Sequence, residues 1–427
     1  MKKFQPTKQL HVYRRLSNGH QILVGQLAQN KLAIFFQYDE NYLAHYHSLS
    51  PFKLPFNNTL STAPKTPHFG LHGVFADSLP DGWGLLLMDR VFRQHNILPQ
   101  QLTAMDRLAY IGDRSMGALS YTPTSDYAEP AQVELTSLAL LGDRAIQLYE
   151  GHIDEVLTVL ANAGGSGGAR PKALIYFNPQ NPQTVVTTPQ PGLQPWLIKF
   201  TSQNLMLAHE EGRCEAAYLS MASNAGIEVP DWQLIEVTND KAWLAMRRFD
   251  CNPSQSETGR YHMHSLCGLL DADFRLPSID YEVLFKASQT LCQSPAIGKA
   301  QFVRALFNLF AVNQDDHSKN WSFLMADDGQ WQLAPFYDIT FSPSPNGEHT
   351  TAFMGYGKQP PLKVVQQLAN QANFSNWKAA QEEIIRVVDA ISQWPTIANK
   401  LGISKKTLKL INARLNSTRE QNKHLLR

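Results

Sequence analysis

The chain has 427 residues, of which 43% are hydrophobic and 18% are charged, a composition typical of globular proteins rather than disordered ones. Its 38 Lys and Arg residues nearly balance 37 Asp and Glu residues, which argues against a protein that coats nucleic acid through bulk charge. The four cysteines form no CxxC pair, and the chain has no signal-peptide pattern and no run of about 18 apolar residues. We therefore expect a cytoplasmic protein without a disulfide framework or a membrane span.

The first part of the chain carries strand patterns followed by one clear helix. Residues 8–60 contain short alternating apolar and polar runs separated by turns, which predict a small antiparallel sheet. The segment 78–84, Ser-Leu-Pro-Asp-Gly-Trp-Gly, opens a helical pattern that runs to about Gln94. A segment punctuated by glycines follows at 111–121.

The middle of the chain is mixed, and a Gly-rich loop at 164–172 is its most distinctive feature. The elements predicted around this loop are a helix over 151–162, strands over 173–177 and 196–200, a helix over 209–226 and two strands over 232–249.

From about residue 262 the pattern is mainly helical. The clearest helices are predicted over 281–293, 299–312, 362–371, 375–393 and 404–420. A β-rich beginning, a mixed middle and a mostly helical second half predict an α+β protein.

Polar residues gather at 315–320, directly after the very apolar stretch 307–312. Asp315 and Asn320 are five positions apart, as the catalytic Asp and the metal-binding Asn of protein kinases are. Two short strand patterns then lead to Asp338, whose carboxylate, with the Asn320 amide oxygen, suits Mg²⁺. Such an Asp–Asn spacing arises about once by chance in a chain of this composition, so turn and cap roles are the alternative. The polar cluster at the end of an apolar helix favours a phosphoryl-transfer site.

Residues upstream are suited to binding a nucleotide. The Gly-rich loop can bring backbone N–H groups close to phosphates, although it lacks the Walker A pattern and could equally be a linker. Lys199 lies in an apolar strand and needs an anionic partner, unless it reaches solvent from a sheet edge. Glu215 on the next helix could pair with Lys199, and 246–250 ends a strand where a kinase hinge would lie. Along the chain, the Gly-rich loop, the strand Lys, the helix Glu, the hinge, the Asp–Asn pair and the metal-binding Asp follow in the order found in bilobed kinases. The sequence therefore predicts a bilobed, ATP-dependent kinase. The absence of HRD and DFG motifs excludes an ordinary eukaryotic-type enzyme.

Four segments resemble the HipA toxins of bacterial type II toxin–antitoxin systems. Residues 307–322 are similar to the catalytic segment of that family, and 333–338 to its metal-binding segment. Residues 78–81 and 111–118 are similar to its N-terminal subdomain. The resemblance implies a bilobed, protein-kinase-like α+β fold divided at 1–125, 126–255 and 256–427 into an N-terminal subdomain, a mixed N-lobe and a helical C-terminal lobe.

The resemblance also implies a Ser/Thr protein kinase that uses ATP and Mg²⁺. Asp315 would be the catalytic base, assisted by the charge of Lys319, while His317 could assist or be structural. Asn320 and Asp338 would bind the metal. The residues implied in nucleotide binding are Ser166, Gly167, Gly168, Ala169, Arg170, Lys172, Lys199, Glu215, Arg247, Phe249 and Asp250.

Family members phosphorylate aminoacyl-tRNA synthetases and cause growth arrest, and a helix-turn-helix antitoxin (HipB-like) neutralises them. The resemblance therefore implies a protein substrate, an antitoxin partner and DNA contact only through that antitoxin. Gly165 aligns with the autophosphorylated Ser of the family, and Ser166, one position later, is the only Ser of the loop. Arg247 stands where Glu is common.

Three other functions fit parts of the sequence. Residues 397–408 resemble a helix-turn-helix, so the chain could bind DNA itself, although the spacing of Leu408, Ile411 and Leu415 favours a packed helical hairpin. A pseudokinase that acts as a binding module would keep the fold without phosphoryl transfer. A kinase without an antitoxin, or one that phosphorylates small molecules, is the third alternative.

Overall fold

The computed structural model describes residues 4–128, 135–153, 156, 158–163, 167–238, 241–252 and 258–427. The chain forms two compact units that interleave along the sequence. Unit 1 contains Met1–Asn204, Ala245–Asp271 and Phe323–Gln330, and unit 2 contains Leu205–Leu244, Ala272–Ser322 and Trp331–Arg427. The division at 1–125, 126–255 and 256–427 stays a prediction.

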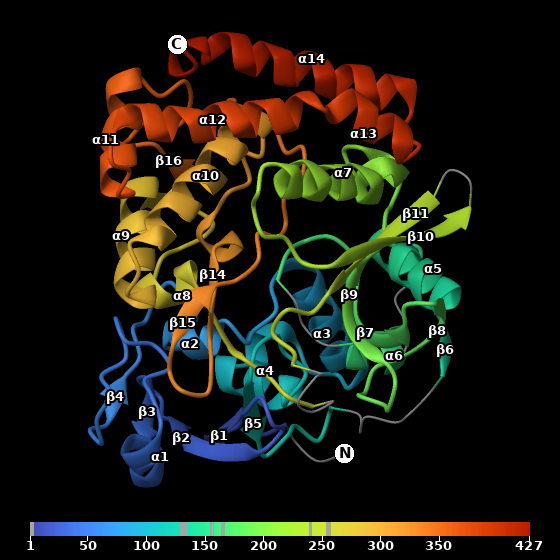
Figure 1. Ribbon diagram of the computed structural model, residues 1–427. Helices are drawn as coiled ribbons and strands as arrows, with labels where there is room; N and C mark the ends of the chain where they lie inside the picture. Colours follow the sequence, from blue (N-terminus) through green and yellow to red (C-terminus); the bar gives the residue numbers. More distant parts are fainter. Residues whose placement is uncertain are drawn as a thin grey trace. The chain divides into compact units, whose positions relative to one another are not determined.

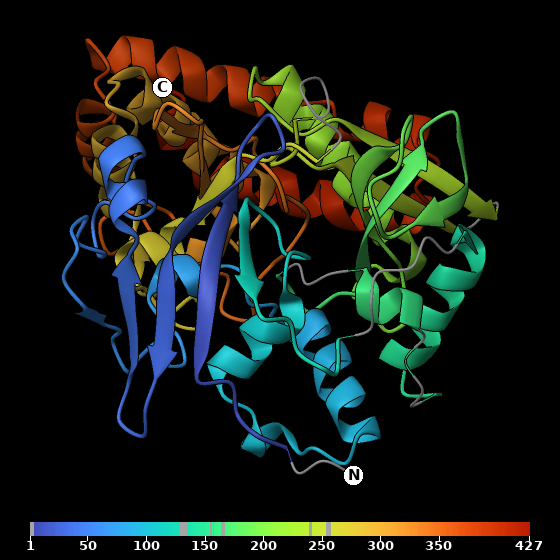
Figure 2. The same ribbon diagram turned by 90° about the horizontal axis from the view of Figure 1, so that it is seen from below.

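The predicted antiparallel sheet opens unit 1 and has five strands in the order β4-β3-β2-β1-β5 (Figure 2). The strands are β1 (Gln9–Arg15), β2 (Gln21–Gln29), β3 (Ile34–Tyr38), β4 (Ser61–Thr62) and β5 (Leu119–Thr122). Alternate residues of β1, including Leu10 and Val12, are buried, which is the period of a strand with one face on the core. The helices that follow are α1 (Glu40–His45), α2 (Gly73–Ala76), α3 (Gly82–Gln94), the 3₁₀ helix η1 (Pro99–Gln101) and α4 (Ala104–Ile111).

The second sheet of unit 1 carries the strand order β11-β9-β7-β8-β6. Its strands are β6 (Thr136–Ser137), β7 (Lys172–Asn178), β8 (Asn181–Val186), β9 (Gln194–Lys199) and β11 (Lys241–Arg247), and the last of these enters unit 1 at Ala245. The accompanying helices are α5 (Leu138–Tyr149) and α6 (Thr158–Asn162). β7 and β9 are antiparallel, and their register places Lys172 opposite Lys199.

Two short helices of unit 1 pack backbone against backbone. These are α2 and α8 (Leu266–Leu270), which follows β12 (His262–Ser265). A Cβ atom added to Gly73 would overlap the carbonyl oxygen of Gly268, so only glycine permits this approach. The strand β14 (Ser322–Met325) lies beside β12 in the sheet order and ends close to the turn that contains Gly329.

Unit 2 is mostly helical, and α10 (Ala296–Ala311) is its central element (Figure 1). This helix contacts α9, α11, α12 and α14, and it is buried on nearly every side, which explains why its apolar residues show no single stripe. The elements of unit 2, apart from the first part of β11, are η2 (Ala208–Glu210), α7 (Glu211–Asn224), β10 (Trp232–Thr238), β13 (Ile279–Asp280), α9 (Tyr281–Cys292), α10, η3 (Ser318–Asn320), β15 (Trp331–Leu333), β16 (Thr351–Ala352), α11 (Leu362–Gln371), α12 (Trp377–Ser392), α13 (Trp394–Lys400), α14 (Lys405–Gln421) and η4 (Lys423–Leu425).

The segment that resembles a helix-turn-helix forms α13, a turn at Gly402 and α14. Ile411 and Leu415 are buried on α14, as the packed-hairpin interpretation predicts, whereas Leu408 is half-buried and Thr407 completes the buried face. The turn is fastened to the start of α7, because the hydroxyl group of Ser404 donates to Glu210 over 2.9 Å and Arg213 donates to the Leu401 carbonyl over 2.8 Å. Direct DNA binding by this segment stays an untested alternative.

No helix in the described part of the chain combines the length and the apolar character needed to cross a lipid bilayer.

Candidate active site

The predicted catalytic segment follows α10, which ends at Val312 in the left-handed conformation with φ of 57°. The side-chain amide of Asn320 donates to the backbone carbonyl of Asp315 over 2.8 Å. This bond folds residues 315–320 into a closed turn and occupies the nitrogen of Asn320, so the amide oxygen is the atom suited to a cation. The side chain of Asp315 is 66% exposed, and its Oδ1 lies 3.8 Å from Nε2 of His317.

The predicted metal-binding segment is held in place by the contacts of Phe336. The ring of Phe336 stacks on Trp321 at 5.9 Å, and the Phe336 amide donates to the Glu228 carbonyl over 2.8 Å. Arg304 lies above the same ring at 5.4 Å and donates to the Ala334 carbonyl over 3.0 Å. Burial lowers the pKa of Arg304 to about 10, against the opposing effect of Glu228. These contacts deliver Asp338 in the left-handed conformation, at φ of 55°, which is strained for a residue other than glycine.

Tyr337 ties the metal-binding segment to the catalytic segment. Its hydroxyl group donates to the Lys319 carbonyl over 2.8 Å and shares a 2.7 Å hydrogen bond with the hydroxyl group of Ser322. Because Tyr337 is adjacent to Asp338 and Lys319 is adjacent to Asn320, this contact constrains the two predicted metal ligands relative to each other.

Phe274 contacts the two other predicted catalytic side chains. The ammonium group of Lys319 lies 4.5 Å from the centre of the Phe274 ring, and the His317 ring lies 5.6 Å from it. Cation–π attraction restrains the Lys319 side chain there. No pattern in the sequence distinguished Phe274 from the other 20 phenylalanines, because its role depends on a contact across about 45 positions.

The donor set of Asn320 and Asp338 fits Mg²⁺ that is bound together with a nucleotide. Such Mg²⁺ needs only one or two protein oxygen ligands, because phosphates and water complete its octahedral shell. The described residues hold no cluster of three or more His, Cys, Asp or Glu side chains placed to bind a metal on their own.

The Gly-rich loop is held by the first residues of α3 and by Asp81 just before them. Ser166 lies outside the described residues, as do Gly164 and Gly165. The backbone amide of Gly168 donates to the Asp81 carboxylate, and its carbonyl accepts from the amide of Trp83 over 3.1 Å. Gly82, with φ of 42°, touches the loop so closely that an added Cβ would lie 2.6 Å from Cα of Ala169. The motif at 78–84 therefore anchors the described part of the loop.

The end of the loop leads directly into β7. The indole Nε1 of Trp83 donates to the Lys172 carbonyl over 2.8 Å, and the ammonium group of Lys172 donates to the Gly167 carbonyl over 2.6 Å. Arg170, between these points, is half-buried, and Ala169 is exposed.

Lys172 and Lys199 form a directly opposed cross-strand pair on β7 and β9. Each residue is only 6% exposed. Directly opposed residues of antiparallel strands have side chains on the same face of the sheet, about 5 Å apart at Cβ. Two cationic side chains on one face of the sheet make that face positive, which is suited to an anionic ligand.

The predicted hinge residues differ in burial. Arg247 and Phe249 are half-buried, whereas Asp250 is fully buried. Arg248 donates to both carboxylate oxygens of Asp250, over 3.1 and 2.6 Å, and the Gly117 amide donates over 2.7 Å. Burial alone would raise the pKa of Asp250, but Arg248, Arg260 and the Gly117 amide together lower it. Asp250 thus joins β11 to the segment at 111–118, a contact that the sequence did not indicate.

Glu215 is buried on α7 in unit 2, and Lys199 belongs to unit 1. Their predicted pairing stays a prediction.

Comparison with protein families gives two matches. The HipA-like C-terminal domain matches residues 164–413, and the HipA N-terminal domain matches residues 19–122. No curated protein sequence matches the chain.

Among solved structures, the chain is similar to HipA of Shewanella oneidensis MR-1 in a complex with HipB and operator DNA. The TM-score is 0.70 at 16% identity, over 97% of each chain, which shows a shared fold. A weaker likeness, with a TM-score of 0.38 and 11% identity, covers 56% of this chain and 92% of the Helicobacter pylori proinflammatory kinase CtkA. The predicted α+β fold of the HipA type is confirmed, and the family model that covers more than half of the chain shows that this protein belongs to the HipA family.

Proposed function

We propose that the chain is a serine/threonine protein kinase of the toxin type, which transfers the γ-phosphate of ATP to a protein hydroxyl group. The observation that carries the proposal is the hydrogen bond from the Asn320 amide to the Asp315 carbonyl. This bond gives the predicted base and the predicted metal ligand a fixed relation, and Tyr337 extends that relation to Asp338. Membership of the HipA family supports the proposal.

Within the catalytic segment each residue has a distinct chemical part. Asp315, whose carboxylate is mostly exposed, would accept the proton of the acceptor hydroxyl group. Lys319 would offset negative charge on the phosphoryl group during transfer. His317, packed beside Phe274, would hold the segment in place. Asn320 and Asp338 would hold Mg²⁺, which would neutralise charge on the phosphates of ATP, the phosphoryl donor.

Apart from Glu215, the residues proposed to bind the nucleotide belong to unit 1. The opposed cations Lys172 and Lys199 would bind phosphates, and the loop residues Ser166, Gly167, Gly168, Ala169 and Arg170 would cover them. Arg247 and Phe249 would contact the adenosine, with Glu215 as the partner of Lys199. The oxygens of Asp250 already accept hydrogen bonds from Arg248 and Gly117. Asp250 would therefore hold the end of β11 in place and also contribute to the ribose site.

The proposed acceptor is an aminoacyl-tRNA synthetase, whose phosphorylation would arrest growth. The proposed partner is a helix-turn-helix antitoxin, in line with the complex in which the Shewanella relative was solved, and DNA would be reached through that partner. The four cysteines are free thiols, which supports a reducing cytoplasm as the place of action.

The test is a labelling experiment with the purified full chain. The chain, Mg²⁺ and ATP labelled at the γ-phosphate are added to a cell lysate, and labelled products are identified by mass spectrometry. We expect label on Ser or Thr of one or a few proteins, with a synthetase among them. Label on small molecules alone would overturn the protein acceptor, and no consumption of ATP would indicate a pseudokinase.

A further inference from the structure

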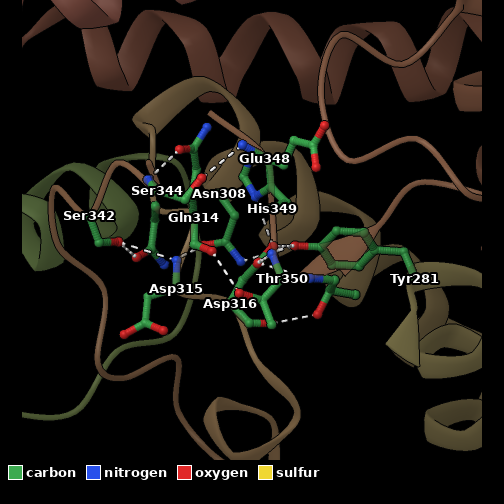
Figure 3. A network of polar contacts seen from close by, with 12 residues as sticks. Tyr281, Asn308, Gln314, Asp315, Asp316, Ser342, Ser344, Glu348, His349 and Thr350 are labelled. Carbon is green, nitrogen blue, oxygen red and sulfur yellow. Dashed lines mark hydrogen bonds and ion pairs between the residues drawn. The ribbon is translucent and has the colours of Figure 1, made fainter. Parts of the chain in front are cut away.

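Asp316, the neighbour of the proposed base, accepts four hydrogen bonds. Its Oδ1 accepts from the amides of Thr350 and Thr351 over 2.9 and 3.1 Å. Its Oδ2 accepts from Nδ1 of His349 over 2.9 Å and from the hydroxyl group of Tyr281 (Figure 3). The side chain is fully buried, so these four donors replace all of its solvation.

The residue on the other side of Asp315 binds the same stretch of chain. The side-chain oxygen of Gln314 accepts from the Ser344 amide over 2.7 Å, and its nitrogen donates to the Gly347 carbonyl over 2.9 Å. The backbone of Gln314 pairs with Ser342 and Thr350. Both neighbours of Asp315 are therefore bonded to residues 342–351, which follow Asp338 in the chain.

A chain of side-chain hydrogen bonds closes this network behind Asp315. Asn308 donates to Tyr281 over 3.2 Å, Asn313 donates to Asn308 over 2.8 Å, and Ser342 donates to Asn313 over 2.8 Å. The Asp315 amide in turn donates to the hydroxyl group of Ser342 over 3.4 Å. Figure 3 shows that the carboxylate of Asp315 points away from this network, while that of Asp316 points into it.

Tyr281 is suited to remain a donor. Burial raises its pKa well above the ordinary value, and the neighbouring Asp316 raises it further. The phenol therefore stays protonated, and can donate to Asp316, throughout the pH range in which proteins are usually studied.

We infer that Asp316 is a positioning residue for phosphoryl transfer, which fixes the backbone of the catalytic segment against residues 342–351 and thereby aims Asp315. The inference rests on the proposed function. In protein kinases a phosphorylated side chain often orders the segment that follows the metal-binding Asp. Here a buried carboxylate supplies the anion permanently, so this segment needs no phosphorylation to be ordered.

Asp280 provides a matched control, because it binds residues just beyond 342–351, also after Asp338, without touching the catalytic segment. Its carboxylate caps α9 at Glu282 and accepts from the amides of Met354 and Gly355 over 3.0 and 2.7 Å. An effect that comes only from loosening the segment after Asp338 should appear on substitution of either Asp. An effect that comes from aiming Asp315 should appear only at Asp316.

The experiment compares Asp316→Asn with Asp280→Asn in the full chain. Asn has the shape of Asp, and its single oxygen can still accept from Thr350 and Thr351, but its NH₂ group faces the two remaining donors. We expect Asp316→Asn to lower kcat about thirtyfold with KM for ATP within about threefold, and Asp280→Asn to keep kcat within about threefold. Unchanged kcat in Asp316→Asn, or an equal loss in both variants, would overturn the inference.

A second readout does not depend on activity. Hydrogen exchange of peptides covering 313–318 should become faster in Asp316→Asn and remain at the wild-type rate in Asp280→Asn. If the wild-type chain transfers no phosphate, the proposed function fails, and equal exchange of 313–318 in both variants would separately overturn the positioning role. If Asp316→Asn does not fold, Tyr281→Phe, which removes one donor, takes its place, with an expected severalfold loss of kcat; unchanged kcat there would overturn the inference.

Discussion

The side-chain amide of Asn320 donates to the backbone carbonyl of Asp315 over 2.8 Å. The two residues are five positions apart, and the bond closes that stretch into a turn with the Asp315 carboxylate exposed on it. A spacing that could arise by chance in the sequence is thus a physical contact in the folded chain. The contact fixes the Asn320 side chain against the backbone of Asp315, as the proposed metal-assisted phosphoryl transfer requires.

Replacing Asn320 by Ala removes both the hydrogen bond and the proposed metal ligand. We expect kcat to fall about a hundredfold and the Mg²⁺ concentration for half-maximal rate to rise. Steady-state kinetics over a Mg²⁺ titration measures both. Asn346→Ala, which alters an exposed loop amide, is the control. A variant at Asn320 with wild-type Mg²⁺ dependence would show that this residue is no metal ligand.

Replacing Lys199 by Met removes one of two opposed buried cations. Because the pair is suited to phosphate, we expect the affinity for ATP to fall about tenfold or more, and the rise in Tm on adding ATP to shrink. Isothermal titration calorimetry and thermal unfolding check these effects. The control is Lys241→Met, which changes another strand lysine, 5.2 Å from the Trp243 ring. Equal ATP binding by the Lys199 variant and the wild type would contradict the phosphate assignment.

Gly82 and Gly151 allow a paired test of the loop anchor. Both have positive φ, 42° and 79°, so replacement by Ala costs about 1 kcal/mol of backbone strain at either position. An added Cβ at Gly82 meets the Gly168 carbonyl at 2.7 Å, whereas at Gly151 nothing lies within 4 Å. We expect Gly82→Ala to weaken ATP binding and Gly151→Ala to leave it unchanged. Normal ATP binding by the Gly82 variant would show that the contact between Gly82 and the loop does not contribute to nucleotide binding.

Two buried histidines of unit 1 make its stability depend on pH. Burial lowers the pKa of His72 to about 4, and burial together with His264 and Arg14 lowers the pKa of His262 to about 3. The unfolded chain binds these protons near pH 6.5, so the folded chain loses stability as the pH falls from about 6.5 to about 4. Each histidine contributes a slope of up to about 1.4 kcal/mol per pH unit.

Urea unfolding between pH 7 and pH 4 measures this slope. His72→Gln can keep the hydrogen bond to Ser61 but takes up no proton, so its slope should be smaller than that of the wild type. His45→Gln, which changes an exposed histidine, is the control. A His72→Gln slope equal to that of the wild type would contradict the lowered pKa.

Helices with strong periodicity were predictable within a few residues. The helix predicted over 299–312 is Ala296–Ala311, and the one predicted over 362–371 has those bounds. The short strands β12, β13 and β16 were not predicted, because strands of two to four residues carry too little alternation to be recognised. Their pairing depends on tertiary contacts, such as that between Ile279 and Thr351.

The candidate site was predictable only where its residues are close in sequence. The spacing of Asp315 and Asn320 is local, Asp338 follows two short strand patterns, and Lys199 is a cation in an apolar strand. Asp81 holds Gly168 from 87 positions away, and Asp316 meets its amide partners 34 and 35 positions later. Such long-range contacts leave no local sequence pattern, because an Asp in a loop is equally typical of an ordinary turn.

The central claim, that Asp315 is the base of a phosphoryl-transfer reaction, is tested most directly by the Asp315→Asn variant. The measurement is transfer of γ-phosphate from labelled ATP to the acceptor protein, with Asp328→Asn, in an exposed turn, as the control. We predict that Asp315→Asn binds ATP with unchanged affinity and transfers phosphate at least about a thousandfold more slowly, while the control matches the wild type. Transfer by Asp315→Asn at the wild-type rate would contradict the account.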